Sequence, residues 1–346
     1  MTSGWRALRR RMMTPNTSAT SLEVRGFHVK DRAAQELLET IGQTFLSGYG
    51  HAAEAATVAE AEAKLEQVPK RFRGFAYEGA AMCYAVLDGL PFGSGRAARF
   101  LAGRGAAHVY MAYVGVGWAM ARLPRFRWHT LHAPDPLLRW LVLDGYGFHQ
   151  AYFHTDRYVR QQYQEARFPW PADGPGWYAG RAIDQGIGRA MWFVGGADPE
   201  RVASMIDEFP AARRPDLYSG AGLAAGYAGG ASEPELRQLA RRAGQHRPQV
   251  AQGCVFAATA RLEAGLMMPH TELATQVFCG MTPEQAIEVS ERARPDAPLS
   301  DGQPLSDGQL LGDGRSGRAD SPLGDALPAY EVWRRRIANT FVSVER

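Results

Sequence analysis

The chain has 346 residues, of which 45% are hydrophobic and 22% charged, and its formal net charge is +3. This composition is typical of a folded globular protein, and the net charge is too small to indicate a nucleic-acid or membrane-surface partner. The three cysteines, Cys83, Cys254 and Cys279, are far apart and form no Cys-x-x-Cys pair. We therefore expect no disulfide framework and a reducing, cytoplasmic environment.

The first elements of the chain are short. Residues 1–20 are predicted to be a disordered N-terminus, because a basic stretch is followed by a Ser/Thr-rich one. That polar stretch also stands where a secretory signal needs an apolar core, so we expect no signal peptide. Residues 21–30 are predicted to be one short extended segment, and hydrophobic periodicity predicts helices over 31–45 and 52–67.

Six glycines at near-even spacing mark the middle of the chain. The steps between them are 36, 30, 41, 34 and 33 residues, and each glycine is followed by an apolar run. A period of this length is typical of stacked supersecondary units. We predict an all-α protein whose helical-repeat domain spans 21–293, with about six hairpins from about residue 72 that form a closed α/α toroid or a curved solenoid. The glycines are Gly79, Gly115, Gly145, Gly186, Gly220 and Gly253, and four of them begin a Gly-x-Gly pair.

Helix-start signals and a terminal helix complete the organisation. Asp198-Pro-Glu is typical of an N-cap, and Ser232-Glu-Pro-Glu and Thr282-Pro-Glu-Gln have the spacing of capping boxes. Residues 294–328 are of low complexity and are predicted to be a flexible loop. Residues 329–346 are predicted to form a helix that docks on the body. Its apolar stripe consists of Val332, Trp333, Ile337 and Phe341.

A nucleotide-binding fold is the rival interpretation. The segments that precede Gly115 and Gly145 could be strands that enter glycine-rich turns, as in βαβ units. Only residues 220–225 fit the Gly-x-Gly-x-x-Ala form, and Pro215-Asp216 precedes them where a strand is needed. Glycines that let neighbouring helix backbones approach are the better explanation. The most apolar stretch, residues 109–121, is too short to span a bilayer.

The densest polar and aromatic cluster lies at residues 144–154. On a helix, Tyr146, His149 and Phe153 would share one face, whereas His149 and His154 would lie about 140° apart and would not form an i,i+4 zinc pair. One interpretation is a buried, hydrogen-bonded histidine and a second at a helix end. The other is that one histidine serves as an acid or base in a cavity.

Polar residues directly precede most of the repeat glycines. If the repeats stack in register, they form a row. They are either N-caps or a line of carboxylates at the mouth of a shared cavity, where apolar walls would keep an acid protonated. These residues are Glu78, Asp144, Asp184 with Gln185, Ser219 and Gln252.

Two further sets of candidates follow. His270 and Glu272 are either a solvated loop pair or secondary site residues. Aromatic residues recur on the glycine helices, as core packing or as the lining of a cavity for a flat, electron-rich ligand such as a polyene. The predicted cavity-lining residues are Tyr77, Tyr113, Trp118, Tyr146, Phe148, Trp192 and Tyr218. No known nucleotide, hydrolase or metal motif occurs, so we expect no cofactor and no metal.

Ten stretches, in order along nearly the whole chain, carry a family resemblance: residues 23–30, 71–80, 107–110, 135–140, 144–149, 152–154, 184–189, 247–253, 269–274 and 330–335. They resemble the UnbL-type family encoded beside enediyne polyketide synthases in actinobacterial gene clusters. The resemblance implies a place in enediyne assembly, where a linear conjugated polyene becomes a strained ring, and it implies no particular catalytic residue. The low-complexity segment has no counterpart in that family.

Together these observations predict a biosynthetic enzyme of the cyclase or isomerase type. It would act on a hydrophobic polyene or polyketide-derived intermediate, supplied by a polyketide synthase as partner. Asp144, His149 and Asp184 are the first candidates for proton transfer. Glu78 and His154 are the second candidates. The alternatives are a non-standard isoprenoid-like polyene cyclase and a non-enzymatic helical scaffold or carrier.

Overall fold

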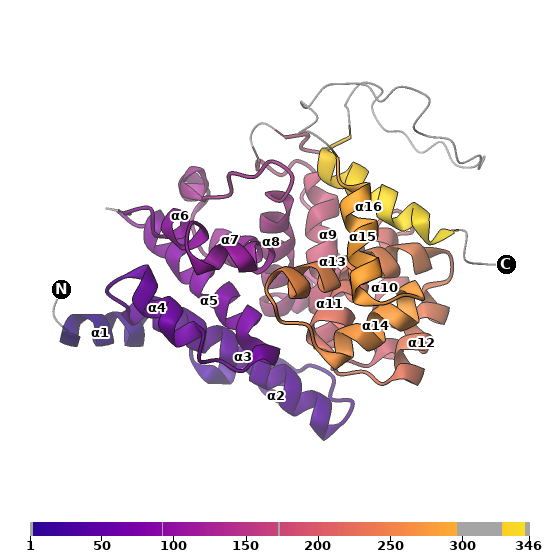
Figure 1. The fold of residues 1–346 in the computed structure, drawn as a ribbon, viewed down its shortest axis with the longest axis horizontal. Helices are drawn as coiled ribbons and strands as arrows, with labels where there is room; N and C mark the ends of the chain where they lie inside the picture. The colour runs from indigo at the N-terminus through magenta and orange to yellow at the C-terminus, as the bar shows by residue number, and fades with distance from the viewer. Residues whose placement is uncertain (1–2, 92, 172–173, 296–326, 343–346) are drawn as a thin grey trace.

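The computed structural model describes residues 3–91, 93–171, 174–295 and 327–342, and within these ranges the chain is all-α and contains no strand (Figure 1). The predicted fold class is therefore confirmed. The α-helices are α1 (Ser3–Met13), α2 (Leu22–Arg25), α3 (Arg32–Glu54), α4 (Val58–Leu65), α5 (Lys70–Gly89), α6 (Arg96–Leu101), α7 (Val109–Met120), α8 (Trp140–Phe153), α9 (Ala179–Val194), α10 (Pro199–Asp207), α11 (Arg214–Ala228), α12 (Glu233–Ala243), α13 (Arg247–Glu263), α14 (Pro269–Cys279), α15 (Pro283–Ala293) and α16 (Ala329–Thr340). Short 3-10 or π segments are η1 (Thr17–Thr20), η2 (Arg104–His108), η3 (Arg125–Thr130), η4 (Asp156–Arg160) and η5 (Gly244–His246).

The six repeat glycines lie inside six different helices, which pack side by side in chain order. Helix α3 packs on α5, and the row continues through α7, α8, α9 and α11 to α13. The segments proposed as strands in the rival interpretation are the helices α7 and α8. The nucleotide-binding interpretation is therefore wrong.

The Gly-x-Gly pairs explain how this row is held together. Residues two apart on a helix point about 200° apart, so one pair serves two opposite neighbours. In α9, a Cβ on Gly186 would lie 1.8 Å from the carbonyl oxygen of Asp144 in α8. A Cβ on Gly188 would lie 2.1 Å from the carbonyl oxygen of Leu217 in α11. Only glycine permits both contacts, so the packing function expected of these glycines is confirmed.

The row curves until its last member meets its first members. Arg261 of α13 is fully buried and donates to the carbonyl oxygens of Arg71 (3.2 Å) at the start of α5 and Tyr227 (2.5 Å) at the end of α11. The hydroxyl of Tyr110 in α7 donates to Glu263 at 3.3 Å. Of the two arrangements predicted from the repeat, a closed toroid and a curved solenoid, these contacts support the closed one.

An outer layer of helices covers the C-terminal half. Helices α10, α12 and α14 follow α9, α11 and α13 and pack on one another, so hairpins are present here. The predicted N-cap of α10 at Asp198 and the predicted capping boxes of α12 at Ser232 and of α15 at Thr282 are confirmed. Between α5 and α8 the connections are shorter helices and irregular segments instead.

Helix α16 docks on the body, as predicted. The Trp333 indole donates to the carbonyl oxygen of Ser290 in α15 at 2.8 Å, and Arg334 pairs with Asp216 at 2.8 Å. Of the preceding low-complexity stretch, residues 296–326 lie outside the described residues.

Three N-terminal predictions are wrong. Residues 3–13 form α1, because Arg10 pairs with Glu54 at 2.7 Å and Arg9 donates to the carbonyl oxygen of Ala53 at 2.5 Å. Residues 22–25 are helical, and the helix predicted to end at residue 45 continues to Glu54. The missing information was tertiary, since the partners of these arginines, the Ala53 carbonyl and the Glu54 carboxylate, lie more than 40 residues away.

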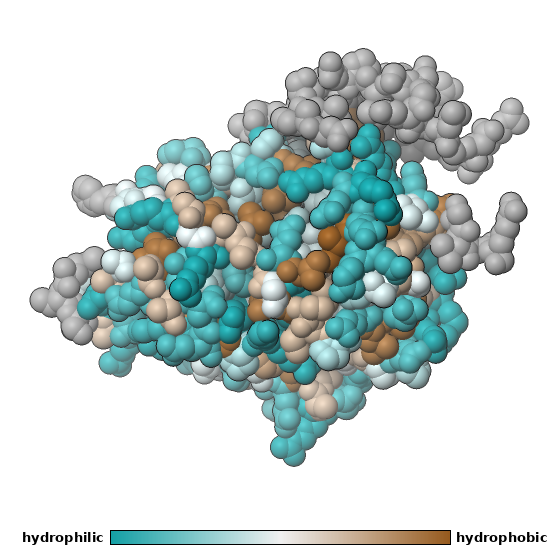
Figure 2. Space-filling model, in the orientation of Figure 1, coloured by the Kyte–Doolittle hydropathy of each residue, from teal (hydrophilic) through white to brown (hydrophobic). Residues whose placement is uncertain are grey.

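None of the helices in the described ranges combines the length and hydrophobicity that a membrane span requires. On the face shown in Figure 2, hydrophobic residues gather in the middle of the view, and hydrophilic residues cover most of the rest.

Candidate functional site

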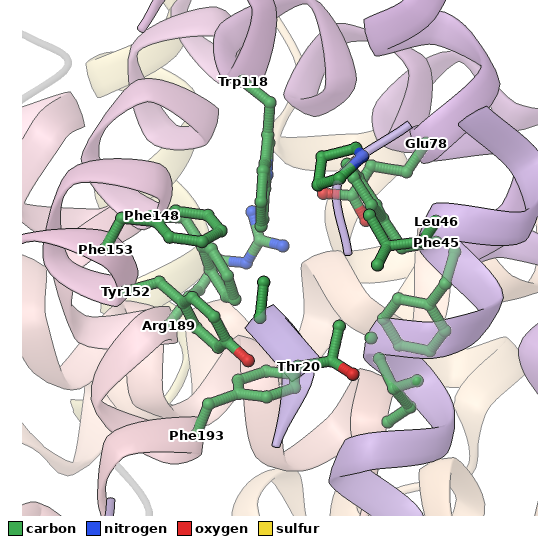
Figure 3. Close-up of a pocket in the computed structure, with 15 residues that line it drawn as sticks. Thr20, Phe45, Leu46, Glu78, Trp118, Phe148, Tyr152, Phe153, Arg189 and Phe193 are labelled. Atoms are coloured by element: carbon green, nitrogen blue, oxygen red, sulfur yellow. The ribbon is translucent and has the colours of Figure 1, made fainter. Parts of the chain in front are cut away.

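An aromatic cavity lies between the N-terminal segment and the helices α3, α5, α7, α8 and α9. The space between its lining atoms, part of it open to solvent, is about 580 Å³, and the centre of a water-sized molecule can occupy about 60 Å³ of it. Figure 3 shows Phe148, Tyr152 and Phe153 on one side and Phe45, Leu46 and Glu78 on the other. The lining residues are Pro15, Ala19, Thr20, Ile41, Gly42, Phe45, Leu46, Phe75, Glu78, Trp118, Phe148, Tyr152, Phe153, Arg189 and Phe193.

The aromatic walls follow from helix periodicity and from glycine packing. Phe148 and Tyr152 are four residues apart on α8, so they share one face. The Trp118 ring bridges the cavity, with its centroid 4.4 Å from that of Phe45 and 5.2 Å from that of Phe148. Thr20 closes the N-terminal side, and a Cβ on Gly42 would lie 2.7 Å from its side chain. The cavity is therefore built from both halves of the row.

Glu78 is the acid of this cavity. It lies in the middle of α5, is 3% exposed, and has no ion-pair partner within 4.0 Å in the described part of the chain. Burial raises the pKa of its carboxyl from the usual 4.5 to about 8, and the Arg189 charge opposes this rise. The indole of Trp118 also lowers this pKa slightly, although no hydrogen bond of normal geometry joins the two groups. Glu78 is thus a protonated carboxylic acid at neutral pH.

Arg189 provides the positive charge beside Glu78. It is 5% exposed, forms an ion pair with Asp144 of α8, and lies 5.2 Å from the centroid of the Phe148 ring. Burial lowers the pKa of Arg189, but the carboxyls of Asp144 and Glu78 raise it by more. The guanidinium therefore stays charged, and it can stabilise Glu78 once that acid has lost its proton.

A hydrogen-bond chain connects this ion pair to α16. Gln185 of α9 donates to the Asp144 carboxylate at 2.7 Å and to the hydroxyl of Tyr330 at 3.1 Å. All three side chains are fully or almost fully buried. The C-terminal helix thus helps to hold the ion pair whose arginine lines the cavity.

The residues 4–307 match the model of a family described as "Protein of unknown function (DUF1702)". The chain belongs to this family. No curated protein and no solved structure gives a match.

In this DUF1702 member, the polar residues before the glycines form a row inside the molecule. Asp144 and Gln185 bond to each other, and Ser219 donates to Gln252 at 2.7 Å. Each lies in the interior of its helix, so the N-cap interpretation is wrong. Only Glu78 of these residues lines the aromatic cavity and Asp184 lines another hollow, so the carboxylates do not share one cavity mouth as the sequence-based hypothesis required.

The two aspartates named as proton-transfer candidates are both held by arginines. Asp144 is paired with Arg189 as described. Asp184 accepts from Arg213 at 2.9 and 2.6 Å, and burial raises its pKa to about 6 while Arg213 lowers it. Asp184 faces a separate small hollow with Tyr146 and Tyr163. The structure therefore separates Asp184 from Glu78.

The two histidines occupy different environments. His149 is 4% exposed behind the cavity wall, where its ring contacts Trp118 and Phe153. Burial lowers the pKa of His149 to about 3, so it is neutral at ordinary pH. His154 is exposed at the end of α8 and lines a surface hollow. Neither ring lines the aromatic cavity.

Of the seven predicted lining aromatics, Trp118 and Phe148 line the cavity. The others serve the packing of helices elsewhere. Tyr77 donates to Glu66, Tyr113 accepts from the Asp135 amide, Trp192 donates to the carbonyl oxygen of Gly229 and Tyr218 donates to Asp207. Tyr146 lines the hollow of Asp184. Core packing is therefore the correct interpretation for these five.

His270 and Glu272 lie on α14, away from the cavity, and not in a loop as proposed. The His270 ring packs against Gly229 and its Nε2 lies 3.0 Å from the carbonyl oxygen of Tyr227. Burial lowers the pKa of His270 to about 4. Glu272 is exposed.

Sequence reasoning missed Arg189 and most of the aromatic wall. A signal for Arg189 was present, because an arginine inside an apolar glycine run needs a buried partner. Phe45 and Phe75 carried no such signal, since they resemble ordinary core residues. Among the described residues, no group of three or more His, Cys, Asp or Glu side chains could hold a metal ion.

Proposed function

We propose that this protein is a biosynthetic enzyme that binds a linear polyene or polyketide-derived intermediate in the aromatic cavity and isomerises or cyclises it by proton transfer from Glu78. The single observation that carries the proposal is the position of Glu78, a protonated acid on the wall of a cavity lined almost entirely by apolar and aromatic side chains. Such an environment favours flat, electron-rich ligands.

The chemistry needs no oxidant. Glu78 gives its proton to one carbon of a conjugated double bond, the π electron pair forms the new C–H bond, and a delocalised cation remains. A second double bond attacks this cation and closes a ring, which moves the positive charge to another carbon. Loss of a proton from the carbon beside that charge to the Glu78 carboxylate then forms a double bond and restores the acid. Without ring closure, the same proton loss moves the double bonds. Aromatic faces such as those of Trp118 and Phe148 stabilise the cation, and Arg189 stabilises the Glu78 carboxylate in between.

Asp144 is assigned a positioning function in this proposal. It neutralises Arg189, so that the cavity does not carry a full positive charge that would oppose the polyene cation. This replaces the sequence-based hypothesis in which Asp144 is itself the proton donor.

The resemblance to the UnbL-type family supports a substrate class. It suggests a conjugated polyene made by a neighbouring enediyne polyketide synthase, as part of a secondary-metabolic pathway. A cytoplasmic location belongs to the same proposal, and Cys83, Cys254 and Cys279 are buried free thiols, as a reducing compartment would allow. An isoprenoid-like polyene is an alternative substrate, because the acid and the aromatic walls suit it equally.

A carrier that shields an unstable polyene is the second candidate function. The almost wholly apolar cavity wall favours it, because binding alone needs no acid.

The test is to incubate the purified full-length protein with a linear conjugated polyene from such a synthase and to follow absorbance and mass. We expect loss of conjugation at unchanged mass. Glu78→Gln should retain polyene binding and slow conversion by about 10²–10⁴-fold, the usual contribution of a general acid. Glu288→Gln, whose side chain is 64% exposed on α15, is the matched control and should convert at the wild-type rate.

Two results would contradict the proposal. Unchanged polyene that co-elutes with both the wild type and Glu78→Gln would reject an enzymatic function and identify a carrier. Equal conversion by both proteins would leave an enzyme but exclude Glu78 as its acid.

A further inference from the structure

We propose that the basic hollow beside the aromatic cavity binds a carboxylate at the end of the ligand's apolar chain, so that the substrate is a polyenoic acid and not a plain hydrocarbon. This inference rests on the proposed function of the cavity. The basic hollow lies between α2, the end of α8 and η4. Its lining includes Arg25, His154, Arg157 and Arg160, together with Asp156, Phe27 and Phe153.

Phe153 forms a wall that the two spaces share. Its side chain lines both the aromatic cavity and the basic hollow. The guanidinium carbon of Arg25 lies 4.7 Å from the centroid of the Phe153 ring and 5.3 Å from that of Tyr152. Tyr152 and Phe153 form one side of the cavity in Figure 3. A positive charge is therefore placed directly behind the aromatic wall, within reach of a group at the end of a chain that passes Phe153.

The positive charge of the hollow is only partly neutralised. Arg160 pairs with Asp156 at 2.6 Å, and both side chains are largely exposed. Arg25 and Arg157 have no carboxylate within 4.0 Å among the described residues. The Arg25 guanidinium donates to the carbonyl oxygen of Tyr152 at 2.5 Å, and its Nε has no partner in the described chain. Two arginines therefore remain available to an anion.

These arginines are held in place by aromatic rings, so little side-chain entropy is lost when an anion binds. Arg157 lies 3.8 Å from the centroid of the Tyr163 ring, and Arg25 is half-buried among three rings. An arginine prearranged in this way suits the planar geometry of a carboxylate.

Two sources could supply an anionic oxygen group here, a free carboxylate or the phosphate of a carrier-bound chain. The shared wall at Phe153 favours the carboxylate, because it is attached directly to the apolar chain. A carrier-bound chain presents an uncharged thioester at that point, and its phosphate is separated from the chain by a long tether.

The experiment measures binding of a conjugated tetraene fatty acid, cis-parinaric acid, and of its methyl ester by fluorescence titration of the full-length protein. We expect the acid to bind about 10-fold more tightly than the ester, as one charge-assisted pair typically provides. Arg25→Gln and Arg157→Gln should each weaken binding of the acid toward that of the ester and leave the ester unchanged, and Arg25→Lys should restore part of the difference. Arg32→Gln, whose side chain is 90% exposed on α3, is the matched control.

The outcomes separate this inference from the proposed function. Equal affinities for acid and ester in the wild type overturn the carboxylate site and leave the aromatic cavity as a binding site. A loss of affinity for acid and ester alike in Arg25→Gln and in Arg157→Gln also overturns it, because the arginines would then be structural. If a phosphopantetheinyl ester competes with the acid but the methyl ester binds as well as the acid, the hollow binds the phosphate of a carrier-bound chain and not a carboxylate. Failure of both parinaric probes to bind rejects the cavity itself and with it the proposed function.

Discussion

Replacing Gly186 by alanine is predicted to separate α8 from α9 and to destabilise the protein. An alanine Cβ at this position would lie 1.8 Å from the Asp144 carbonyl oxygen, whereas real Cβ atoms essentially never approach closer than 3.0 Å. The two helices would have to move apart by the difference, about 1.2 Å. The obstacle is backbone, so no side-chain rotation can relieve it.

The expected size of this effect follows from two opposing terms. Alanine is favoured over glycine in a helix interior by about 1 kcal/mol. Overpacking of a rigid core costs about 1–3 kcal/mol and occasionally more, and a rigid backbone contact belongs at the upper end of that range. The net prediction is a loss of at least about 2 kcal/mol in the free energy of unfolding.

The assay is thermal and urea unfolding followed by circular dichroism. Gly4→Ala is the matched control, because Gly4 lies in α1 and an added Cβ there meets no atom within 4 Å. It should unfold at the wild-type midpoint or slightly above it. If Gly186→Ala unfolds at or above the wild-type midpoint as well, close backbone contact is not what these glycines provide.

Two further predictions concern buried charges. Arg334→Met should destabilise the protein by about 3–5 kcal/mol, because it leaves the buried Asp216 and Glu331 with fewer partners. Arg335→Met removes a half-exposed partner of the same Glu331 and should lower the free energy of unfolding by less than about 1 kcal/mol in the same urea titration. Equal effects of the two substitutions would contradict this account of α16 docking. For Glu78, the pKa of about 8 in the folded protein exceeds the usual 4.5. Between pH 4.5 and pH 8 the folded state therefore keeps a proton on this carboxyl that the unfolded state has lost. Its contribution is fully present below about pH 4.5 and is lost as pH rises toward 8, and the stability of the wild type relative to Glu78→Gln should therefore fall by up to about 1.4 kcal/mol per pH unit across this window. Parallel stability curves for the two proteins would show that Glu78 is ionised in the native state.

Glycine spacing was enough to predict the helical class and the packing function of the glycines. The reason is physical, since a glycine with an apolar run after it has few uses in a helix other than close backbone approach. The same local logic predicted the N-caps at Asp198 and Thr282, because a cap depends only on residues within one turn.

The candidate site was predictable only in part. The sequence indicated that polar residues before the glycines would form a row, and that Trp118 and Phe148 would line a cavity. Sequence reasoning ranked Asp144 and Asp184 as the first proton-transfer candidates and Glu78 as a secondary one. The structure reverses this order, because Arg189 and Arg213 neutralise the two aspartates and leave Glu78 as the acid that faces the cavity.

What the sequence by itself determined was the helical class, the helices that carry the repeat glycines and the N-caps, since capping and glycine spacing depend on nearby residues. What only the tertiary structure decided was which side chains share one space. Glu78 and Arg189 are more than 100 residues apart, and Thr20, from a segment predicted to be disordered, completes the wall between them. Burial and charge pairing depend on such distant neighbours, and they set both the protonation of Glu78 and the shape of the cavity.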